Sequence, residues 1–477
     1  MVDNFTIRDI NLGLKQKKFS CQEITSLYLK KALENKHNAY ISFDEEGALA
    51  KAEEIDKKIK AGKEIGILAG VPIAVKDVIM TKNLKTTAAS KTLENYTAVY
   101  DATVVEKLKE AGVVILGKTN CDEFAMGSSN ENSYFGPVKN PWDLKRVPGG
   151  SSGGSAAVVS EPADEAVFSL GTDTGGSIRQ PAAFCGVVGF KPTYGRVSRY
   201  GLIALASSLD QIGPLTKNVE DAAVVMQQIS GLDKHDATSS DQAVPEYFKD
   251  LITKPKDLTI GLPKECFSGS LNSEIKDKIN YMVELFKKEG FKIKEISLPT
   301  IPYALACYYI IQPAEASANL ARYDGLRYGF GYREAEDLEF LYQLNRKEGF
   351  GDEVRRRIII GTFVLSAGYK DAYYKKAQAV RQLIIEDFQK AFADVDLIIT
   401  PTTPEPAFAI GEKISDPLSM YLSDIYTVSI NISGLPAISL PIGFTKQKLP
   451  IGMQIIGNYY KESEILRLAK LVEGLVR

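Results

Sequence analysis

The chain has 477 residues, of which 44% are hydrophobic and 25% charged, and its formal net charge is −2. This composition is ordinary for a globular protein with a large core, and the near-neutral charge gives no general electrostatic reason to bind nucleic acid or an anionic membrane. Five cysteines without a Cys-x-x-Cys spacing argue against a structural metal site, and no long apolar run occurs, so we expect a cytoplasmic protein that holds no metal.

Helix and strand patterns alternate along most of the sequence. Ser20 and Glu23 have the spacing of a capping box, which predicts a helix over 20–34. β-Branched runs predict a buried strand at 71–75, just before Lys76, and another at 113–116. The other predicted elements are helices at 45–61, 102–111, 219–230, 273–289 and 462–476, and strands at 258–262, 291–297, 395–400, 436–442 and 451–457. The alternation indicates an α/β fold with a largely buried sheet.

Residues 303–393 interrupt this alternation. Their patterns predict helix almost throughout, with long periodic runs at 352–366 and 371–393. Strand patterns return afterwards, and the sequence contains neither an internal repeat nor a linker of disordered composition. We therefore expect a single domain over 1–477, in which 303–393 is a helical insertion that caps the sheet.

Two glycine-rich segments, 146–155 and 171–182, each deliver serines that could act as nucleophiles. A serine nucleophile needs a base, and the chain has only two histidines. The Gly-x-Ser-x-Gly pattern of many hydrolases occurs within 149–154, but a glycine-rich loop matches it easily, and the pattern would need His235, which lies in a polar loop. The better candidate for the base is Lys76.

Lys76 follows an apolar run, so we expect it to be buried at the end of a strand. Burial lowers the pKa of a lysine, and a lysine base must be neutral to accept a proton. Two ordinary roles remain open, an exposed lysine at a strand terminus and an ion pair with the adjacent Asp77. Ser151 and Ser152 lie between two Gly-Gly pairs, and a serine there would relay a proton between the nucleophile and the lysine.

Ser177 follows Gly175 and Gly176 and precedes a run that is compatible with a helix. Glycines before a serine allow backbone N–H groups to point at a developing oxyanion, and the N-terminus of a helix adds positive potential. A phosphate-binding loop is the competing interpretation, but its Gly-x-x-x-x-Gly-Lys-Ser/Thr pattern is absent. The pattern therefore favours acyl transfer.

With these residues in view, the chain resembles the amidase signature family of serine hydrolases. The resemblance implies an α/β/α fold with a mixed central sheet and a Ser–cis-Ser–Lys triad. Ser177 would be the nucleophile, Ser151 the bridging serine and Lys76 the base. A cis peptide bond between Gly150 and Ser151 is also implied. The oxyanion hole would consist of the backbone amides of Thr174, Gly175 and Gly176. One departure is visible, because segment 158–165 is slightly longer than the family spacing.

Within this family, the chain resembles the glutaminase subunits of tRNA-dependent amidotransferases. The resemblance covers essentially the whole chain, and its segments include 120–129, 189–202, 206–214, 313–325, 356–363 and 373–378. It implies hydrolysis of glutamine, with ammonia passed to partner subunits, B and C, in a heterotrimer. Those partners would amidate glutamate misacylated on tRNA(Gln), and ATP and Mg would be used by the complex. No cofactor is implied for this subunit.

The same resemblance implies a glutamine pocket. Arg357 would bind the α-carboxylate and Asp424 the α-ammonium, and a bidentate arginine suits a carboxylate. Tyr308 and the backbone of Gly127 and Ser128 would line the pocket. An ordinary alternative for Arg357 is a charge on the surface of a helix, within the run 355–357.

Two other functions remain as alternatives. A stand-alone amidase acting on aryl, fatty or peptide amides would share the triad but would not need paired charges for a free amino acid. A non-catalytic scaffold in a tRNA-processing complex would need no triad at all.

Overall fold

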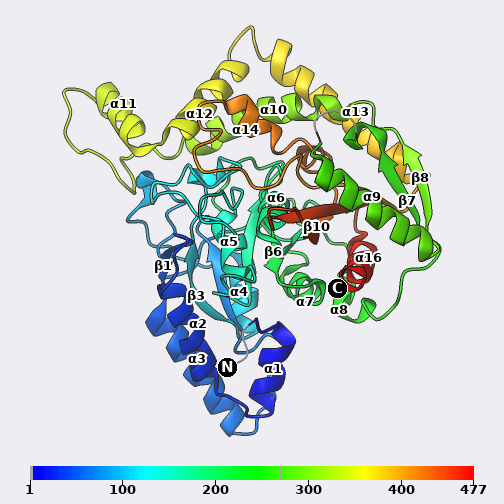
Figure 1. Ribbon diagram of the computed structural model, residues 1–477. Coiled ribbons are helices and arrows are strands. Elements are labelled where there is room, and N and C mark those ends of the chain that lie inside the picture. The colour runs from blue at the N-terminus through cyan, green and yellow to red at the C-terminus, as the bar shows by residue number, and fades with distance from the viewer. Residues whose placement is uncertain (1–3, 268–270, 477) are drawn as a thin grey trace.

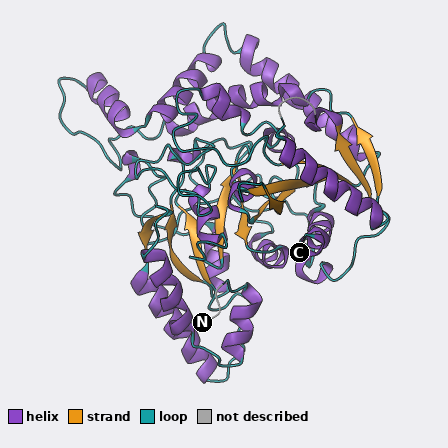
Figure 2. Ribbon diagram, in the orientation of Figure 1, coloured by secondary structure: helices purple, strands orange, loops and turns teal. Residues whose placement is uncertain are grey.

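The computed structural model of the chain describes residues 4–267 and 271–476. Its centre is one mixed sheet of 11 strands in the order β1-β3-β2-β4-β6-β5-β10-β11-β9-β7-β8. The strands are β1 (Tyr40–Phe43), β2 (Pro72–Lys76), β3 (Val114–Thr119), β4 (Phe168–Asp173), β5 (Val188–Lys191), β6 (Gln211–Thr216), β7 (Thr259–Pro263), β8 (Lys292–Ile296), β9 (Leu397–Pro401), β10 (Ala437–Phe444) and β11 (Pro450–Gly457). Figure 2 shows most of these strands in the middle of the molecule with helices around them, and β7 and β8 at its right edge. The predicted α/β class with a mixed central sheet is confirmed.

Strand direction decides which residues meet at the edge of the sheet. β2 is parallel to both of its neighbours, β3 and β4, whereas β4, β6, β5, β10, β11 and β9 pair in antiparallel fashion. Because the carboxyl ends of parallel strands lie at the same edge, the last residues of β2 and β4, Lys76 and Asp173, lie at one edge together. The second glycine-rich segment continues from this edge, since β4 leads directly into residues 174–177.

The helices cover the sheet and extend beyond it. They are α1 (Ile7–Lys15), α2 (Cys21–Leu33), α3 (Glu45–Lys60), α4 (Thr103–Glu110), α5 (Gly153–Val159), α6 (Arg179–Cys185), α7 (Val219–Ile229), α8 (Tyr247–Asp250), α9 (Ser273–Lys288), α10 (Ala304–Leu320), α11 (Leu338–Gly349), α12 (Asp352–Leu365), α13 (Lys376–Phe392), α14 (Pro417–Leu422), α15 (Val428–Ser433) and α16 (Glu462–Leu475). The predicted capping box begins α2, because Ser20 Oγ accepts the Glu23 N–H at 3.1 Å and the Glu23 carboxylate accepts the Ser20 N–H at 2.7 Å.

Helices α10 to α13 lie between β8 and β9 in the chain and form the upper part of the molecule in Figure 1. The prediction of helix almost throughout 303–393 is wrong for 321–337, which is neither helix nor strand. Gly325 and Gly329 there have φ of +75° and +77°, a conformation that a right-handed helix does not contain. A further difference is a π-helical turn at Asp371–Lys375, just before α13.

Four strands, β1, β4, β5 and β6, were not among the predicted elements. β4 and β6 contain polar residues and the facing pair Gly171 and Gly213, and β6 also contains Pro214. Glycine and proline are uncommon inside strands, so local pattern does not reveal these two elements. They are recognised only once they pair with each other in the sheet.

Two expectations from the sequence concerned the state of the cysteines and the presence of a membrane-spanning helix. All five cysteines are free thiols and buried. Within residues 4–267 and 271–476, no helix combines the length and the apolar character needed to cross a membrane.

Gly213 offers a test of the central sheet. A Cβ at this position would lie 2.0 Å from the backbone oxygen of Phe190, so Gly213→Ala should force β5 and β6 apart and lower the free energy of unfolding by about 1–3 kcal/mol. Gly474, in α16, has nothing within 4 Å of such a Cβ, and Gly474→Ala should be neutral or slightly stabilising. Denaturant unfolding of both variants provides the comparison, and equal unfolding midpoints would contradict the close approach.

Candidate active site

Lys76, the last residue of β2, is fully buried. Its Nζ lies 2.8 Å from Ser151 Oγ, 2.9 Å from Ser152 Oγ and 2.8 Å from Thr172 Oγ1. The serines come from the first glycine-rich segment and Thr172 from the neighbouring strand β4. The alternative of an exposed lysine at a strand terminus is therefore excluded.

Asp77 does not pair with Lys76. Its carboxylate accepts the backbone N–H of Thr87 at 2.8 Å and also the Thr87 hydroxyl, and it lies 3.6 Å from the ammonium group of Lys118. The second ordinary role for Lys76, an ion pair with its neighbour in the chain, is thus excluded as well.

Burial lowers the pKa of Lys76 to about 8, although negative groups near it, among them Asp122 and Asp173, act in the opposite direction. The three hydroxyl groups around Nζ carry no formal charge, so they hold the amine in place without the strong stabilisation of the ammonium form that a carboxylate partner would bring. A neutral amine is therefore accessible near neutral pH.

The segment 149–152 brings the two glycine-rich segments together. The peptide bond between Gly150 and Ser151 is cis, as the resemblance implied. Gln180, from α6, accepts the Gly150 N–H at 2.9 Å, and the Ser152 N–H donates to the backbone oxygen of Ser177 at 3.2 Å. A Cβ on Gly150 would lie 2.1 Å from the carboxylate of Asp122, so only glycine fits this position.

Ser177 lies two residues before α6 and is 8% exposed. Its hydroxyl makes no hydrogen bond with any other residue of the described chain. The serine is therefore largely enclosed, and its hydroxyl would have to hydrogen-bond to Ser151 to be activated as a nucleophile.

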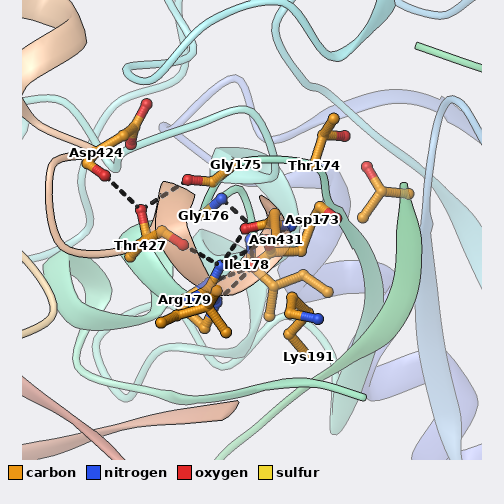
Figure 3. A network of polar contacts seen from close by, with 12 residues as sticks. Asp173, Thr174, Gly175, Gly176, Ile178, Arg179, Lys191, Asp424, Thr427 and Asn431 are labelled. Carbon is orange, nitrogen blue, oxygen red and sulfur yellow. Dashed lines mark hydrogen bonds and ion pairs between the residues drawn. The ribbon is translucent and has the colours of Figure 1, made fainter. Parts of the chain in front are cut away.

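The turn that carries Ser177 is held by the carboxylate of Asp173 (Figure 3). This carboxylate accepts the backbone N–H groups of Gly176 at 2.9 Å and Ile178 at 3.1 Å. It also accepts Nε and Nη2 of Arg179 at 3.0 and 2.9 Å, and Nδ2 of Asn431 at 2.9 Å. Burial would raise the pKa of Asp173, but the guanidinium of Arg179 beside it holds that pKa at about 2.

This arrangement affects the predicted oxyanion hole. The Gly176 N–H is engaged with Asp173, and the Thr174 hydroxyl donates to Asp210 at 2.7 Å. Gly176 has φ of +134°, and a Cβ on it would lie 2.2 Å from Thr427 Oγ1, so the residue must be glycine. Three backbone amides were predicted to form the oxyanion hole. Those of Thr174 and Gly175 are the two that do not donate to Asp173.

Arg357 is buried, with 3% of its surface exposed, and lies on the face of α12 that packs against α10. Its Nε donates to Glu353 at 2.8 Å, and its Nη1 donates to Gln312 Oε1 at 2.8 Å. The alternative of a helix-surface charge is therefore excluded for Arg357, although Arg356 in the same run remains partly exposed.

Asp424 is also buried and lies near Arg357. One of its carboxylate oxygens, Oδ2, accepts the Ser128 hydroxyl, and the other, Oδ1, is buried without a hydrogen-bond partner among the described residues. Burial raises the pKa of Asp424 to about 7, against the effect of Ser128 and Arg357, which lower it. A cationic group placed beside Oδ1 would restore the charged form.

Tyr308 and Gly127 complete the predicted pocket. A Cβ on Gly175 would lie 2.8 Å from the Tyr308 hydroxyl, so Tyr308 lies directly over the turn before Ser177. Gly127 contributes to a cavity of about 250 Å³ that Arg357 and Tyr421 also line. Tyr308 therefore contacts the serine turn, whereas Gly127 and Arg357 share a cavity whose lining does not include Tyr308, Asp424 or Ser177.

Several residues of the site were not predicted. Ser152 was considered beside Ser151, but Thr172, Asp173, Gln180 and Gln312 were not considered. Asp173 lies next to a glycine-rich turn, and a carboxylate there is a signal that could have been used. Thr172 and Gln312 have no comparable local signal, since their partners are far away in the sequence. Within the described residues, no group of three or more His, Cys, Asp or Glu side chains is arranged to hold a metal ion.

Comparison with known proteins agrees with this geometry. The family model described as Amidase matches residues 23–466. The chain belongs to the amidase family. One curated relative of this amidase is the A subunit of the glutamyl-tRNA(Gln) amidotransferase of Koribacter versatilis. The two chains are 54% identical over 475 residues, and the match covers 99% of this chain and 98% of the relative.

Solved structures of other amidases have the same fold. The A subunit of the glutamyl-tRNA(Gln) amidotransferase of Thermotoga maritima is 43% identical, with a TM-score of 0.80 over 98% of this chain and 94% of that one. The peptide amidase of Stenotrophomonas maltophilia is 28% identical, with a TM-score of 0.84 over 99% of this chain and 97% of that one. The fold is therefore shared by amidases that differ in substrate.

The pKa of Lys76 leads to a prediction about the reactivity of this amidase. If Lys76 is the base, a fluorophosphonate probe should label Ser177 at a rate that rises with pH and is half-maximal near pH 8, because only a neutral amine accepts a proton. The measurement is the labelling rate between about pH 6 and 10. Lys76→Met should label slowly and without this rise, and a flat profile for the unchanged protein would contradict the role of Lys76.

Proposed function

We propose that this chain is the glutamine-hydrolysing subunit of a tRNA-dependent amidotransferase, and that it supplies ammonia for the conversion of Glu-tRNA(Gln) to Gln-tRNA(Gln). The observation that carries the proposal is that Arg357 and Asp424 are both buried and lie close enough for the guanidinium to act on the pKa of the carboxyl group. A buried cation and a buried anion near each other suit the α-carboxylate and α-ammonium of a free amino acid. The names of the curated relatives and of the Thermotoga structure support the same assignment.

The hydrogen bonds around Lys76 support a relay through Ser151. The Ser152 hydroxyl donates to the backbone oxygen of Thr172 at 3.0 Å, so its hydrogen is not available to Lys76. A neutral amine has two N–H groups and one lone pair. When the N–H groups donate to Ser152 and Thr172, the lone pair faces Ser151, whose hydroxyl then donates to Nζ. This arrangement makes Ser151 the serine that passes a proton to the base.

The reaction follows from these positions. Ser177 Oγ attacks the side-chain amide carbon of glutamine, and its proton passes to Ser151 while the proton of Ser151 passes to Lys76. The amides of Thr174 and Gly175 stabilise the oxyanion. The proton returns through Ser151 to the amide nitrogen, the C–N bond breaks and ammonia leaves. Water then hydrolyses the γ-glutamyl ester by the same route, which releases glutamate and restores Ser177.

The partners are a further part of the proposal. The relatives are named as the A subunit of an amidotransferase, so we place the ATP- and Mg-dependent amidation and the binding of tRNA in the other subunits, B and C, of a cytoplasmic heterotrimer. The ammonia released at Ser177 would pass to those subunits. This chain itself needs no cofactor for the reaction derived above.

A stand-alone amidase is the second candidate, since a peptide amidase has the same fold. The buried Arg357 and Asp424 are the features that argue against it, because an amide without charged groups would leave Oδ1 of Asp424 unpaired and would make no use of the guanidinium of Arg357. A scaffold without activity is less consistent still, since it would have no use for a buried lysine whose Nζ is surrounded by the hydroxyl groups of Ser151, Ser152 and Thr172.

Substitution of the nucleophile tests the division of labour. In the assembled complex, Ser177→Ala should lower glutamine-dependent amidation of Glu-tRNA(Gln) by at least about a thousandfold, because no acyl ester forms. Amidation with added ammonium chloride should be unchanged, since ammonia then bypasses this subunit. Loss of both activities would contradict the proposal.

Substrate choice separates the two candidates. We expect ammonia release from glutamine, little release from asparagine, and little from a simple aryl amide, with the glutamine rate rising when partners and charged tRNA are added. The measurement is ammonia production by the chain alone and by the complex. Rapid turnover of the aryl amide by the chain alone, with glutamine ignored, would favour the stand-alone amidase.

A further inference from the structure

Gln312 is a fully buried residue of α10 whose side-chain nitrogen has no hydrogen-bond partner among the described residues. Its oxygen Oε1 accepts Nη1 of Arg357 at 2.8 Å. A guanidinium group offers only N–H donors, so the amide must present its oxygen to Arg357, and this fixes the orientation of the group. The amide nitrogen, Nε2, is consequently a buried donor that lacks an acceptor.

The packing of α10 against α12 holds this arrangement in place. A Cβ on Gly361 would lie 1.9 Å from the backbone oxygen of Pro313, so the two helices approach as closely as glycine allows. The guanidinium of Arg357 lies 5.3 Å from the ring centre of Tyr309 and 5.6 Å from that of Tyr421. Glu353, which lies on α12 as Arg357 does, accepts the hydrogen bond from Nε of Arg357. Gln312 therefore has little freedom to turn its nitrogen to another partner.

Gln312 lies one helical turn after Tyr308, so the two side chains lie on the same face of α10. Tyr308 contacts the turn before Ser177, and Gln312 accepts a hydrogen bond from Arg357. Asp424, whose oxygen Oδ1 is unpaired, lies close enough to Arg357 for the guanidinium to lower its pKa. One unpaired buried donor and one unpaired buried acceptor thus lie near Arg357.

Each such atom is unfavourable when it stays unpaired in a buried position. A ligand that carries both a carboxylate and an ammonium group would satisfy both atoms, the carboxylate at Gln312 and Arg357 and the ammonium at Asp424. An amide with only apolar groups around it would satisfy neither. The two atoms, with the charge of Arg357 beside them, therefore suit the α-carbon end of an amino acid.

We propose that Gln312 is a specificity-determining residue whose Nε2 donates a hydrogen bond to the α-carboxylate of the substrate, beside Arg357. The inference rests on the proposed function, since it takes glutamine as the substrate. It adds a second recognition group for the carboxylate, and it assigns the side chain of Gln312 two simultaneous contacts, with Arg357 through oxygen and with the substrate through nitrogen.

Two analogues of glutamine test the contact in the assembled complex. Glutaramate lacks the α-ammonium group and 4-aminobutanamide lacks the α-carboxylate. Gln312→Leu should raise KM about tenfold for glutamine and for glutaramate, with kcat little changed, since it removes one hydrogen bond to a charged group. KM for 4-aminobutanamide should not change. Equal losses with all three amides, or no loss with glutamine, would overturn the proposal.

Asp424→Asn is the matched control. It should weaken the binding of glutamine and 4-aminobutanamide but not that of glutaramate, because it removes the partner of the ammonium group. The opposite patterns of the two variants would assign each residue to its own end of the substrate.

A second comparison separates direct contact from an effect through Arg357. In an Arg357→Lys background, Gln312→Leu should raise KM for glutaramate by a further several-fold if Gln312 touches the substrate. A residue that only positions the guanidinium would cause no further loss in that background, and this result would overturn the direct contact.

Gln312→Glu provides a variant that retains the size of the side chain and the bond to Arg357. It replaces the donor with a carboxylate, so KM for glutamine and glutaramate should rise more than in Gln312→Leu, while labelling of Ser177 by a fluorophosphonate stays normal and reports a folded site.

A wild-type complex that fails to hydrolyse glutamine would overturn the proposed function. A wild-type complex that hydrolyses glutamine, with Gln312 variants that match it, would overturn only the role of Gln312.

Discussion

The buried pair of Asp173 and Arg179 is the interaction on which the active site depends. The carboxylate of Asp173, at the end of β4, holds the backbone of the turn that carries Ser177. The guanidinium of Arg179 reaches Gln454 of β11 at 2.5 Å and Asn431 of α15 at 2.6 Å. One ion pair thus joins the serine turn to segments that lie more than two hundred residues later in the chain. A buried pair of this kind is expensive to break, because the remaining charge would be left without a partner.

Chemistry and selectivity come from different parts of the fold. The catalytic groups belong to the sheet and its loops. Lys76 and Thr172 lie near the ends of the parallel strands β2 and β4, and Ser151 and Ser152 follow Gly150 in a loop. Of the groups that would recognise an amino acid, Arg357 and Gln312 come from helices between β8 and β9, and Asp424 follows α14. A site assembled in this way allows substrate choice and chemistry to vary separately on one fold.

Burial acts on two groups of opposite charge with the same result. It lowers the pKa of Lys76 to about 8 and raises the pKa of Asp424 to about 7, so each group is brought towards its neutral form. For Lys76, neutrality is what a proton acceptor requires. For Asp424, an arriving ammonium group would restore the charge, so binding and ionisation are coupled. The same low-polarity surroundings therefore prepare the base and make the pocket selective for a charged ligand.

Local signals were sufficient for much of the fold. The capping box at Ser20 and the β-branched run before Lys76 depend on neighbours within a few residues, and both gave the correct element and, for Lys76, the correct burial. Periodicity failed at 321–337, where Gly325 and Gly329 adopt positive φ, and it missed β4 and β6, whose glycines and Pro214 are tolerated only because the strands pair with each other. These elements depend on partners that a local pattern does not contain.

The sequence by itself determined the alternation of helices and strands, the two serine turns and the absence of a histidine base, because each of these follows from residue type and short-range spacing. Only the tertiary structure decided that Thr172 joins the serines around Lys76, that Asp173 engages the Gly176 amide, and that Arg357 is buried against Gln312. The physical reason is that hydrogen bonding of a buried group depends on which distant segments pack beside it, and packing is a property of the whole chain.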